Sequence, residues 1–251
     1  STLSSSSAAS DVYKRQGCGK TSIVETMAYR AGATGQIGNI QSGNTISDYS
    51  AEEIARQSSI NLSIIPIEWD NCKINLIDVP GTFDFVGETE AALSVCESAL
   101  IICPSYAGIS AGTKQAMYKA RDKGKIIYIN GLDNPNSDYP TKLQQLKDTY
   151  GKSIAPIQVP IMDNNKMVGY VNVAKMEGRM FENGQTHEAP IPEDMMDEVL
   201  PIKAMIDEAV ANTSDELLEK YLEEECYSFY AITIGTVSYT HLRAHETDSY
   251  L

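Results

Sequence analysis

The chain has 251 residues, of which 42% are hydrophobic and 22% charged, and its formal net charge is −14. These fractions are typical of a soluble globular protein and exclude a disordered or collagen-like chain. No apolar run reaches the roughly 20 residues that a membrane span needs, and no basic segment followed by an apolar one opens the chain as in a signal peptide. The five cysteines lack C-x-x-C spacing and neighbouring histidines, which disfavours a zinc site and indicates thiols in a reducing compartment.

The two ends of the chain carry matching runs. Residues 11–16 and 237–242 can be encoded by reverse-complementary DNA, and both resemble translations of a transposon-end adapter used in sequencing-library preparation. We therefore set residues 1–16 and 237–251 aside as an adapter-like artefact that we expect to be disordered, and an ordinary Ser-rich tail is the alternative. The 220 residues between them suffice for one domain that carries an insertion.

The first interpretable residues form the back half of a phosphate-binding loop. In the pattern G-x-x-x-x-G-K-[ST], backbone N–H groups wrap the phosphates, the Lys reaches the outer phosphates and the Ser/Thr hydroxyl holds Mg²⁺. The loop residues that follow this pattern are Gly17, Cys18, Gly19, Lys20 and Thr21. Lys14 stands where the first glycine belongs, and no apolar run precedes it. We therefore expect the first strand to be missing and the chain as written to bind GTP weakly or not at all.

Helix and strand patterns alternate after this loop. The predicted helices are 21–31, 86–98, 113–123 and 141–150. The predicted strands are 60–69, 74–77, 99–103 and 126–129. The last three strands are short apolar runs, as in strands buried on both faces of a parallel sheet, whereas the polar residues 35–58 indicate a mobile loop. Residues 17–156 therefore predict an α/β fold with a doubly wound, mostly parallel sheet of the P-loop NTPase type, truncated at both ends.

The pattern changes after residue 156. Residues 157–173 alternate like an antiparallel hairpin set with a turn at 163–165, and two acidic helices follow, over 192–210 and from a capping box at 213–216. Residues 182–225 hold 14 acidic side chains against two lysines. This charge disfavours binding to a phosphate backbone and is typical of a solvated face or of a surface for a basic partner. We interpret residues 157–236 as an α+β insertion subdomain.

A D-V-P-G motif begins at Asp78, directly after the predicted strand 74–77. This position places the Asp78 carboxylate at the carboxyl end of a strand, where ligands of such sheets gather. There it can hold Mg²⁺ through water, while the N–H group of Gly81 meets a γ-phosphate. A common turn is the alternative for this motif taken alone.

An N-G-L-D motif ends the predicted strand 126–129. The carboxylate of Asp133 can accept two hydrogen bonds from the N1 and N2 donors of guanine, and Asn130 ties this loop to the phosphate loop. Gly131 stands where such motifs normally carry a lysine whose stem lies along the base. An Asn/Asp-rich turn before Pro135 is the alternative.

The order G-K-T, D-V-P-G, N-G-L-D resembles the translational GTPases, in particular elongation factor G with its relatives, which include the ribosomal protection proteins. The supporting runs are 29–32, 56–60, 78–85, 191–194 and 215–223, of which D-x-P-G-x-x-D-F at 78–85 is specific. The resemblance covers nearly all of residues 17–236. It implies GTP hydrolysis on the ribosome during translocation, with GTP or GDP and Mg²⁺ as ligands.

The resemblance also assigns roles to single residues. Ser59 aligns with the switch threonine that binds Mg²⁺ in the GTP state, although plain loop polarity also explains a serine there. Thr82 stands where the family has the histidine that orients the attacking water; because threonine lacks the reach of an imidazole, we expect impaired hydrolysis. The implied site residues are catalytic Lys20, Gly81 and Thr82; nucleotide-binding Gly17, Cys18, Gly19, Lys20, Thr21, Asn130 and Asp133; and metal-binding Thr21, Ser59 and Asp78.

The resemblance implies a fragment of a cytoplasmic, monomeric GTPase that lacks the last guanine-contact motif and all later domains. Its acidic insertion is similar to the subdomain that touches the ribosomal stalk protein, and neither DNA nor a membrane is an expected partner. The alternatives are a ribosomal protection-type GTPase and a non-hydrolysing, GTP-dependent ribosome-binding module, which Thr82 and Gly131 favour. A small regulatory GTPase is disfavoured by the 80-residue insertion.

Overall fold

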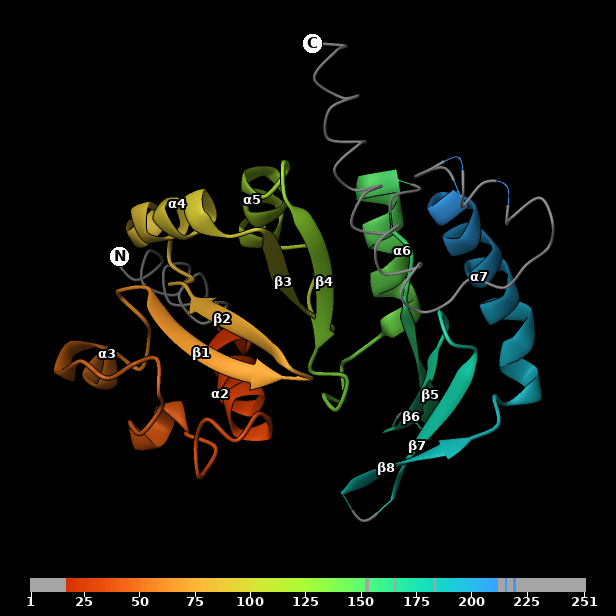
Figure 1. Ribbon diagram of the computed structural model, residues 1–251, viewed down its shortest axis with the longest axis horizontal. Helices are drawn as coiled ribbons and strands as arrows, with labels where there is room; N and C mark the ends of the chain where they lie inside the picture. The colour runs from red at the N-terminus through yellow and green to blue at the C-terminus, as the bar shows by residue number, and fades with distance from the viewer. Residues whose placement is uncertain are drawn as a thin grey trace, which may run out of the picture. The chain divides into compact units, whose positions relative to one another are not determined.

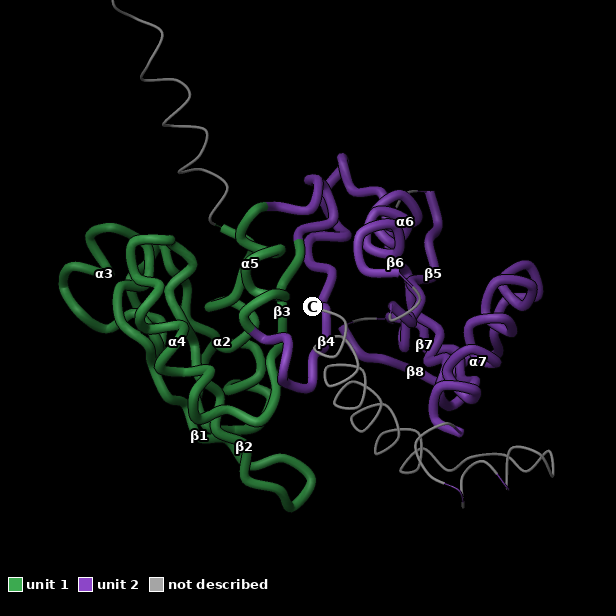
Figure 2. The backbone as a smooth tube through the Cα atoms, turned by 90° about the horizontal axis from the view of Figure 1, so that it is seen from above, with its two compact units in different colours: residues 1–103, 111–119 green, residues 104–110, 120–251 purple. Residues whose placement is uncertain are grey.

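The computed structural model describes residues 17–151, 154–164, 166–182 and 184–211, together with residues 215 and 219. These residues form two compact units, one from residues up to 103 and from 111–119, the other from 104–110 and from 120 onward (Figure 2). We describe each unit by itself. The adapter-like ends lie outside the described residues. Of the capping box predicted at 213–216, only residue 215 is described.

Unit 1 contains the first strands and helices of the predicted alternation (Figure 1). Its helices are α2 (Lys20–Arg30), η1 (Ile40–Ser42), α3 (Ala51–Arg56), η2 (Phe83–Phe85), α4 (Val86–Val95) and α5 (Ala111–Lys119). Its strands are β1 (Ser63–Trp69), β2 (Cys72–Asp78) and β3 (Ser98–Pro104). The predicted helices 21–31, 86–98 and 113–123 and the three predicted strands are confirmed, with ends that differ by a few residues.

The strands β1 and β2 form an antiparallel hairpin that covers α2 (Figure 1). Inward residues of β1 alternate with outward ones, and Ile65 and Ile67 pack with Ala28 of α2 in a small core. The outer residues of β2 remain in solvent, since Ile74 is 38% exposed. The prediction that the run 74–77 is buried on both faces was therefore wrong, because among the described residues α2 covers only one face of the hairpin.

The segment between α2 and β1 is more ordered than its polar sequence suggests. It contains η1 and α3, and α3 begins with a capping box in which Ser50 and Glu53 exchange side-chain and backbone hydrogen bonds. The prediction of a mobile loop over residues 35–58 missed these two helices. The S-x-x-E pattern at residues 50–53 carried the signal for this helix.

Unit 2 is an antiparallel sheet with helices packed on it. The strands of this sheet are β5 (Gln158–Asp163), β6 (Lys166–Asn172), β7 (Glu177–Glu182) and β8 (Gln185–Ala189), and β4 (Gly124–Asn130) lies in the unit but outside this sheet. Its helices are α6 (Tyr139–Tyr150), η4 (Glu193–Met195) and α7 (Met196–Ala211). The four strands β5 to β8 pair in sequence order, so the predicted hairpin set at 157–173 is confirmed. The hairpin β7–β8 was not predicted, because its polar sequence shows little alternation.

The core of unit 2 joins the end of the predicted nucleotide domain to the predicted insertion. Val159, Val171 and Val173 from the sheet side pack against Val199 and Val210 of α7, and each of these side chains is at most 2% exposed. Tyr139 and Leu143 of α6 belong to the same cluster. None of the helices in the described part of the chain combines the length and apolar character needed to cross a bilayer.

Candidate functional site

The phosphate loop leads directly into α2. Gly19 is the N-cap residue and has a φ of 85°, a left-handed conformation that glycine adopts without strain. No side chain of the described residues caps this end of α2, so its first N–H groups can bind an anion. The Nζ atom of Lys20 lies 3.8 Å from Sγ of Cys18, and Gly17 at the start of the loop is exposed.

A buried hydrogen bond connects this loop to the D-V-P-G motif. The hydroxyl of Thr21 donates to Oδ2 of Asp78 at 2.8 Å, although 57 residues separate them, and both residues are buried. Burial raises the pKa of the Asp78 carboxyl above its usual value, while the hydrogen bond from Thr21, the nearby Ser47 and the charge of Lys20 act in the opposite direction. The structure therefore brings Lys20, Thr21 and Asp78 together at one end of β2.

A second buried carboxylate lies beside this pair. Burial raises the pKa of the Asp48 carboxyl, nearby Ser59 acts in the opposite direction, and the negative charges of Asp78, Glu53 and Glu25 raise it further. Neither carboxylate oxygen of Asp48 has a hydrogen-bond partner among the described residues. Ser59, predicted as a metal ligand, thus lies near Asp48. No sequence motif pointed to Asp48, since nothing local shows that a carboxylate in a polar segment is buried.

Two buried glutamates fix the segment that carries Asp48 and Ser59. Glu25 of α2 accepts hydrogen bonds from the backbone N–H groups of Gly38 and Ile46 at 2.8 and 2.5 Å. Glu53 of α3 accepts from Ile60 and Asn61 at 2.9 and 3.1 Å. Each glutamate is 1% exposed, and both act as anchors whose charge is matched by backbone donors.

Burial alone would raise the pKa of Glu53. The hydrogen bonds from the backbone of Ile60 and Asn61 and from Ser50 outweigh that effect and hold its pKa below the ordinary value of 4.5. Glu53 is therefore ionised at neutral pH, and its charge contributes to holding residues 60 and 61 in place.

The two residues after the D-V-P turn differ in their surroundings. Gly81 is exposed, whereas Thr82 is 7% exposed and is the N-cap residue of η2. The Thr82 hydroxyl has no hydrogen-bond partner among the described residues. A buried hydroxyl without a partner is costly, so it is a natural place for a water or a ligand oxygen to bind.

The base-recognition motif lies in unit 2, at the end of β4. Asp133 is exposed, and the backbone of the motif turns through a hydrogen bond from Asn134 N–H to the Gly131 carbonyl at 3.1 Å. Ser105 holds this turn from the neighbouring loop. Its N–H donates to the Asn130 carbonyl at 2.8 Å and its hydroxyl donates to the Gly131 carbonyl at 2.6 Å.

The apolar residues on either side of this turn connect it to the core of unit 2. Ile129 and Leu132 are half-buried and pack against the cluster that contains Val159, Val171 and Val199. The core that supports Asp133 is therefore the same core that holds the predicted insertion together.

The donors near Thr21 fit a hard divalent cation better than a transition metal. The residues available are hydroxyls and carboxylates, the oxygen ligands that Mg²⁺ prefers. Within the described ranges, no group of three or more His, Cys, Asp or Glu side chains forms a ready-made metal site. A Mg²⁺ ion here would therefore depend on Thr21, Asp78, water and ligand phosphates together.

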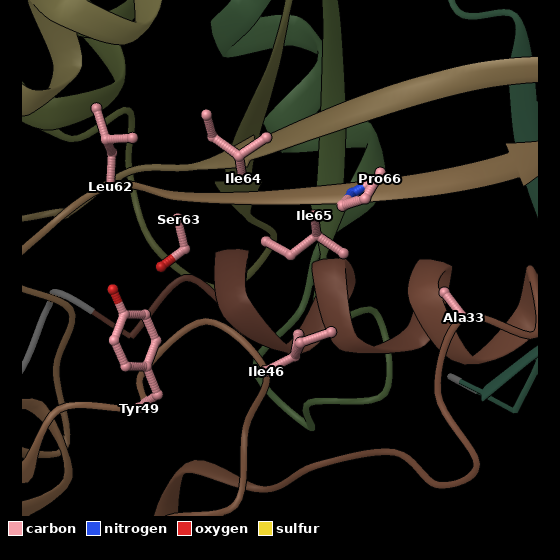
Figure 3. Close-up of a pocket in the computed structure, with 8 residues that line it drawn as sticks. All are labelled: Ala33, Ile46, Tyr49, Leu62, Ser63, Ile64, Ile65 and Pro66. Atoms are coloured by element: carbon pink, nitrogen blue, oxygen red, sulfur yellow. The ribbon is translucent and has the colours of Figure 1, made fainter.

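An apolar pocket of about 480 Å³ opens beside the same segment, between β1 and the loop before α3 (Figure 3). Ser63 and Ile65 point from β1 toward the loop residues Ile46 and Tyr49, and Pro66 continues the lining along the strand. None of the described residues that line this pocket is charged. It is therefore distinct from the phosphate-binding end of α2.

Comparisons with known proteins agree with this geometry. The family model for the elongation factor Tu GTP binding domain matches residues 16–239. The chain is 30% identical to elongation factor G of Mycoplasma pneumoniae over 210 residues, which are 82% of this chain and 30% of that protein. A crystal structure of a protein from Thermus thermophilus superposes with a TM-score of 0.81 at 30% identity, covering 90% of this chain and 34% of that one.

These matches confirm the predicted fold class and the predicted resemblance to translational GTPases. The chain spans about a third of the length of the relatives it matches. By its sequence and by its fold, the chain belongs to the family of the elongation factor Tu GTP binding domain.

Proposed function

We propose that this chain is the nucleotide-binding part of an elongation factor G-like translational GTPase whose full-length form binds GTP and GDP with Mg²⁺. This chain binds them weakly, because Lys14 stands where the phosphate loop needs a glycine. The observation that carries the proposal is the buried hydrogen bond between Thr21 and Asp78, because it joins the phosphate loop to the D-V-P-G motif. The N-G-L-D turn in unit 2 supplies the groups for a guanine base.

In the phosphate subsite, each residue has a separate task. The uncapped N–H groups of α2 receive the phosphate oxygens, and Lys20 neutralises the charge of the outer phosphates. Thr21 and Asp78 would hold Mg²⁺, and Ser59 would join them in the GTP state. When bound, the ion neutralises charge on the phosphates as the terminal bond breaks.

In the base subsite, Asp133 accepts hydrogen bonds from the N1 and N2 donors of guanine. Adenine presents an acceptor at N1 and no amino group at C2, so the same carboxylate disfavours it. In this proposal, Asn130 stabilises the turn. Ser105 supports the proposal, because it fixes the backbone on which Asp133 depends.

For hydrolysis, the exposed Gly81 N–H would meet the γ-phosphate and the Thr82 hydroxyl would contact the attacking water. The unpartnered, buried hydroxyl of Thr82 supports this contact. Threonine accepts a hydrogen bond from water but cannot match the reach of a histidine, so we propose slow hydrolysis in the full-length protein and impaired hydrolysis in this chain.

The proposed setting is the cytoplasmic ribosome. Residues 157–236 form the acidic insertion in this proposal, residues 17–156 form the nucleotide domain, and the insertion contacts the basic surface of a stalk protein. The exposed Glu188 of β8 and the exposed Glu198 and Glu208 of α7 support this view, since they present negative charge to solvent. We propose a monomer with neither DNA nor a membrane as partner.

A non-hydrolysing, GTP-dependent ribosome-binding module is the second candidate, favoured by Thr82, and a ribosomal protection-type GTPase is a third. Single-turnover cleavage of GTP by the full-length protein with ribosomes separates the first two. Cleavage stimulated by ribosomes supports the GTPase, whereas ribosome binding without cleavage supports the module. Calorimetry on this chain with GDP, GTP and ATP tests nucleotide binding itself, and a preference for ATP would overturn the proposal.

A further inference from the structure

The N-G-L-D turn has no side chain at its second position. Gly131 has no side chain, and its φ of 76° is a conformation in which other residues are strained. The turn itself therefore offers an edge contact through Asp133 and no contact for the face of a purine.

An aromatic ring from the neighbouring loop occupies that place. The Cε1 and Cδ1 atoms of Tyr106 lie 3.2 and 3.4 Å from the point where a Cβ atom of residue 131 would be. A larger residue at position 131 would have to push the Tyr106 ring aside. Tyr106 and Gly131 thus form a complementary pair, in which one residue leaves the space that the other fills.

The ring is presented to solvent from a fixed backbone. Tyr106 is 45% exposed. The residue before it, Ser105, is tied to the N-G-L-D turn by two hydrogen bonds, and the carbonyl of Ala107 after it accepts a hydrogen bond from the buried side chain of Lys142. The loop is anchored on both sides of Tyr106, so the ring is held beside the turn rather than free to leave it.

A purine that binds by its edge still exposes two apolar faces. Aromatic side chains stack on such faces, and this stacking is favourable for every base because each has a π-surface. We infer that Tyr106 stacks on the guanine base and supplies the face contact that Gly131 lacks. This inference rests on the proposed function, and it makes Tyr106 a nucleotide-binding residue of this chain.

Trp69 is the only tryptophan in the chain, which allows a direct spectroscopic test. In the double variant Trp69→Phe and Tyr106→Trp, a single indole reports on the proposed stacking position. GMP is the probe, because it carries the base and depends little on the phosphate subsite. We expect saturable quenching of the indole by GMP at millimolar concentrations and weaker quenching by AMP.

A variant series separates stacking from a structural role. Stacking energies predict that Tyr106→Ala weakens GMP and GDP binding by roughly 5- to 150-fold. Tyr106→Phe keeps the aromatic face and should bind as the parent does, whereas Tyr106→Leu should bind as weakly as Tyr106→Ala. Tyr128→Ala is the matched control, since Tyr128 lies in the same unit and is also 45% exposed. Thermal melts of all variants show whether an affinity loss follows from unfolding.

The possible outcomes separate the stacking of Tyr106 from guanine nucleotide binding itself. If GMP leaves the indole unquenched, or if Tyr106→Ala binds GDP as tightly as the parent, the stacking inference is overturned while guanine nucleotide binding stands. If Leu restores affinity as well as Phe does, the ring acts only as filler and the inference is overturned in the same way. If the parent chain binds neither GMP nor GDP, both the inference and the proposed nucleotide site of this chain are overturned.

Discussion

The proposed phosphate subsite in unit 1 and the proposed base subsite in unit 2 are positioned by different kinds of interaction. In unit 1, buried side chains do the positioning, because Thr21 contacts Asp78 directly and Glu25 and Glu53 anchor the surrounding segment. In unit 2, backbone hydrogen bonds, the Ser105 hydroxyl and a hydrophobic core position the turn, and the carboxylate of Asp133 is itself exposed.

This difference indicates which substitutions would disturb each proposed subsite. Buried carboxylates in unit 1 depend on every donor around them, so the loss of one hydroxyl or one charge disturbs the group itself. The exposed Asp133 can be exchanged without harm to the fold, whereas its supporting core cannot. Changes of specificity should therefore come from unit 2, and changes of pH or metal dependence from unit 1.

The largest expected effect is a change of base preference by Asp133→Asn. Loss of two hydrogen bonds to a charged carboxylate should weaken GDP binding by roughly 10²- to 10⁴-fold. Xanthine carries a carbonyl at C2, to which the new amide can donate, so xanthosine diphosphate should bind the variant better than GDP does. Calorimetry with both nucleotides measures this exchange. Asp122→Asn, at another exposed aspartate of unit 2, should leave the preference unchanged, and an equal loss in both variants would contradict the assignment.

The second prediction concerns the core beneath the base subsite. Val171 is fully buried, and Val171→Ala should lower the free energy of unfolding of unit 2 by about 2–3 kcal/mol. Because Ile129 and Leu132 pack on this core, hydrogen exchange of residues 129–133 should accelerate more than that of α2. Mass spectrometry of exchanged peptides measures the ratio. Val95→Ala, at a 73% exposed position, is the control, and equal acceleration in both regions would show that the core does not support the turn.

The third prediction tests the contact between Thr21 and Asp78. Thr21→Ala removes the hydroxyl and leaves a buried acceptor without its donor, which should cost about 2 kcal/mol of stability. The same change should abolish the effect of Mg²⁺ on GDP affinity, measured with and without a chelator. Thr26→Ala, on the same helix, removes an exposed hydroxyl that bonds only to the carbonyl of Ser22, and it should preserve the Mg²⁺ effect. A Mg²⁺ effect that persists in Thr21→Ala would argue against Thr21 as a ligand.

The smallest effect is expected at Glu53. Glu53→Gln should lower stability by about 1–2 kcal/mol at neutral pH, because the amide replaces a charged acceptor of several N–H groups. The folded-state pKa of Glu53 lies below its ordinary value of 4.5, so its contribution is complete above that pH and is lost as the pH falls through the folded-state pKa. Urea melts across this range should show the two proteins converging in acid. Glu52→Gln, at the exposed neighbouring position, should match the parent at every pH.

The elements and motifs that depend on local pattern could be predicted from the sequence. The helix after the phosphate loop, the apolar strands and the positions of Asp78 and Asp133 at strand ends follow from spacing and periodicity. The relation between Thr21 and Asp78 was also within reach, because both belong to recognisable motifs whose partners share a ligand.

Other features depend on contacts that no local pattern records. The burial of Glu25 and Asp48 arises from the path of the segment between α2 and β1, and the placement of Tyr106 against Gly131 arises from the meeting of two loops. The hairpin β7–β8 is polar, and its Arg179 forms salt bridges with Glu177 and Glu188, each at 3.0 Å. Its strands therefore lack the apolar alternation from which a hairpin can be predicted. Of these features, only α3 has a local sequence signal that the prediction did not use, namely the capping box at residues 50–53.

The central claim of the proposal is that Lys20 and Thr21 hold the phosphates of a guanine nucleotide and that Asp133 holds a guanine base. A crystal structure of this chain with GDP and Mg²⁺ tests it directly. The account predicts phosphate oxygens within hydrogen-bond reach of the Lys20 Nζ atom, and guanine N1 and N2 within reach of the Asp133 carboxylate. Phosphates that bind away from Lys20, or a guanine base that binds away from Asp133, would contradict the account.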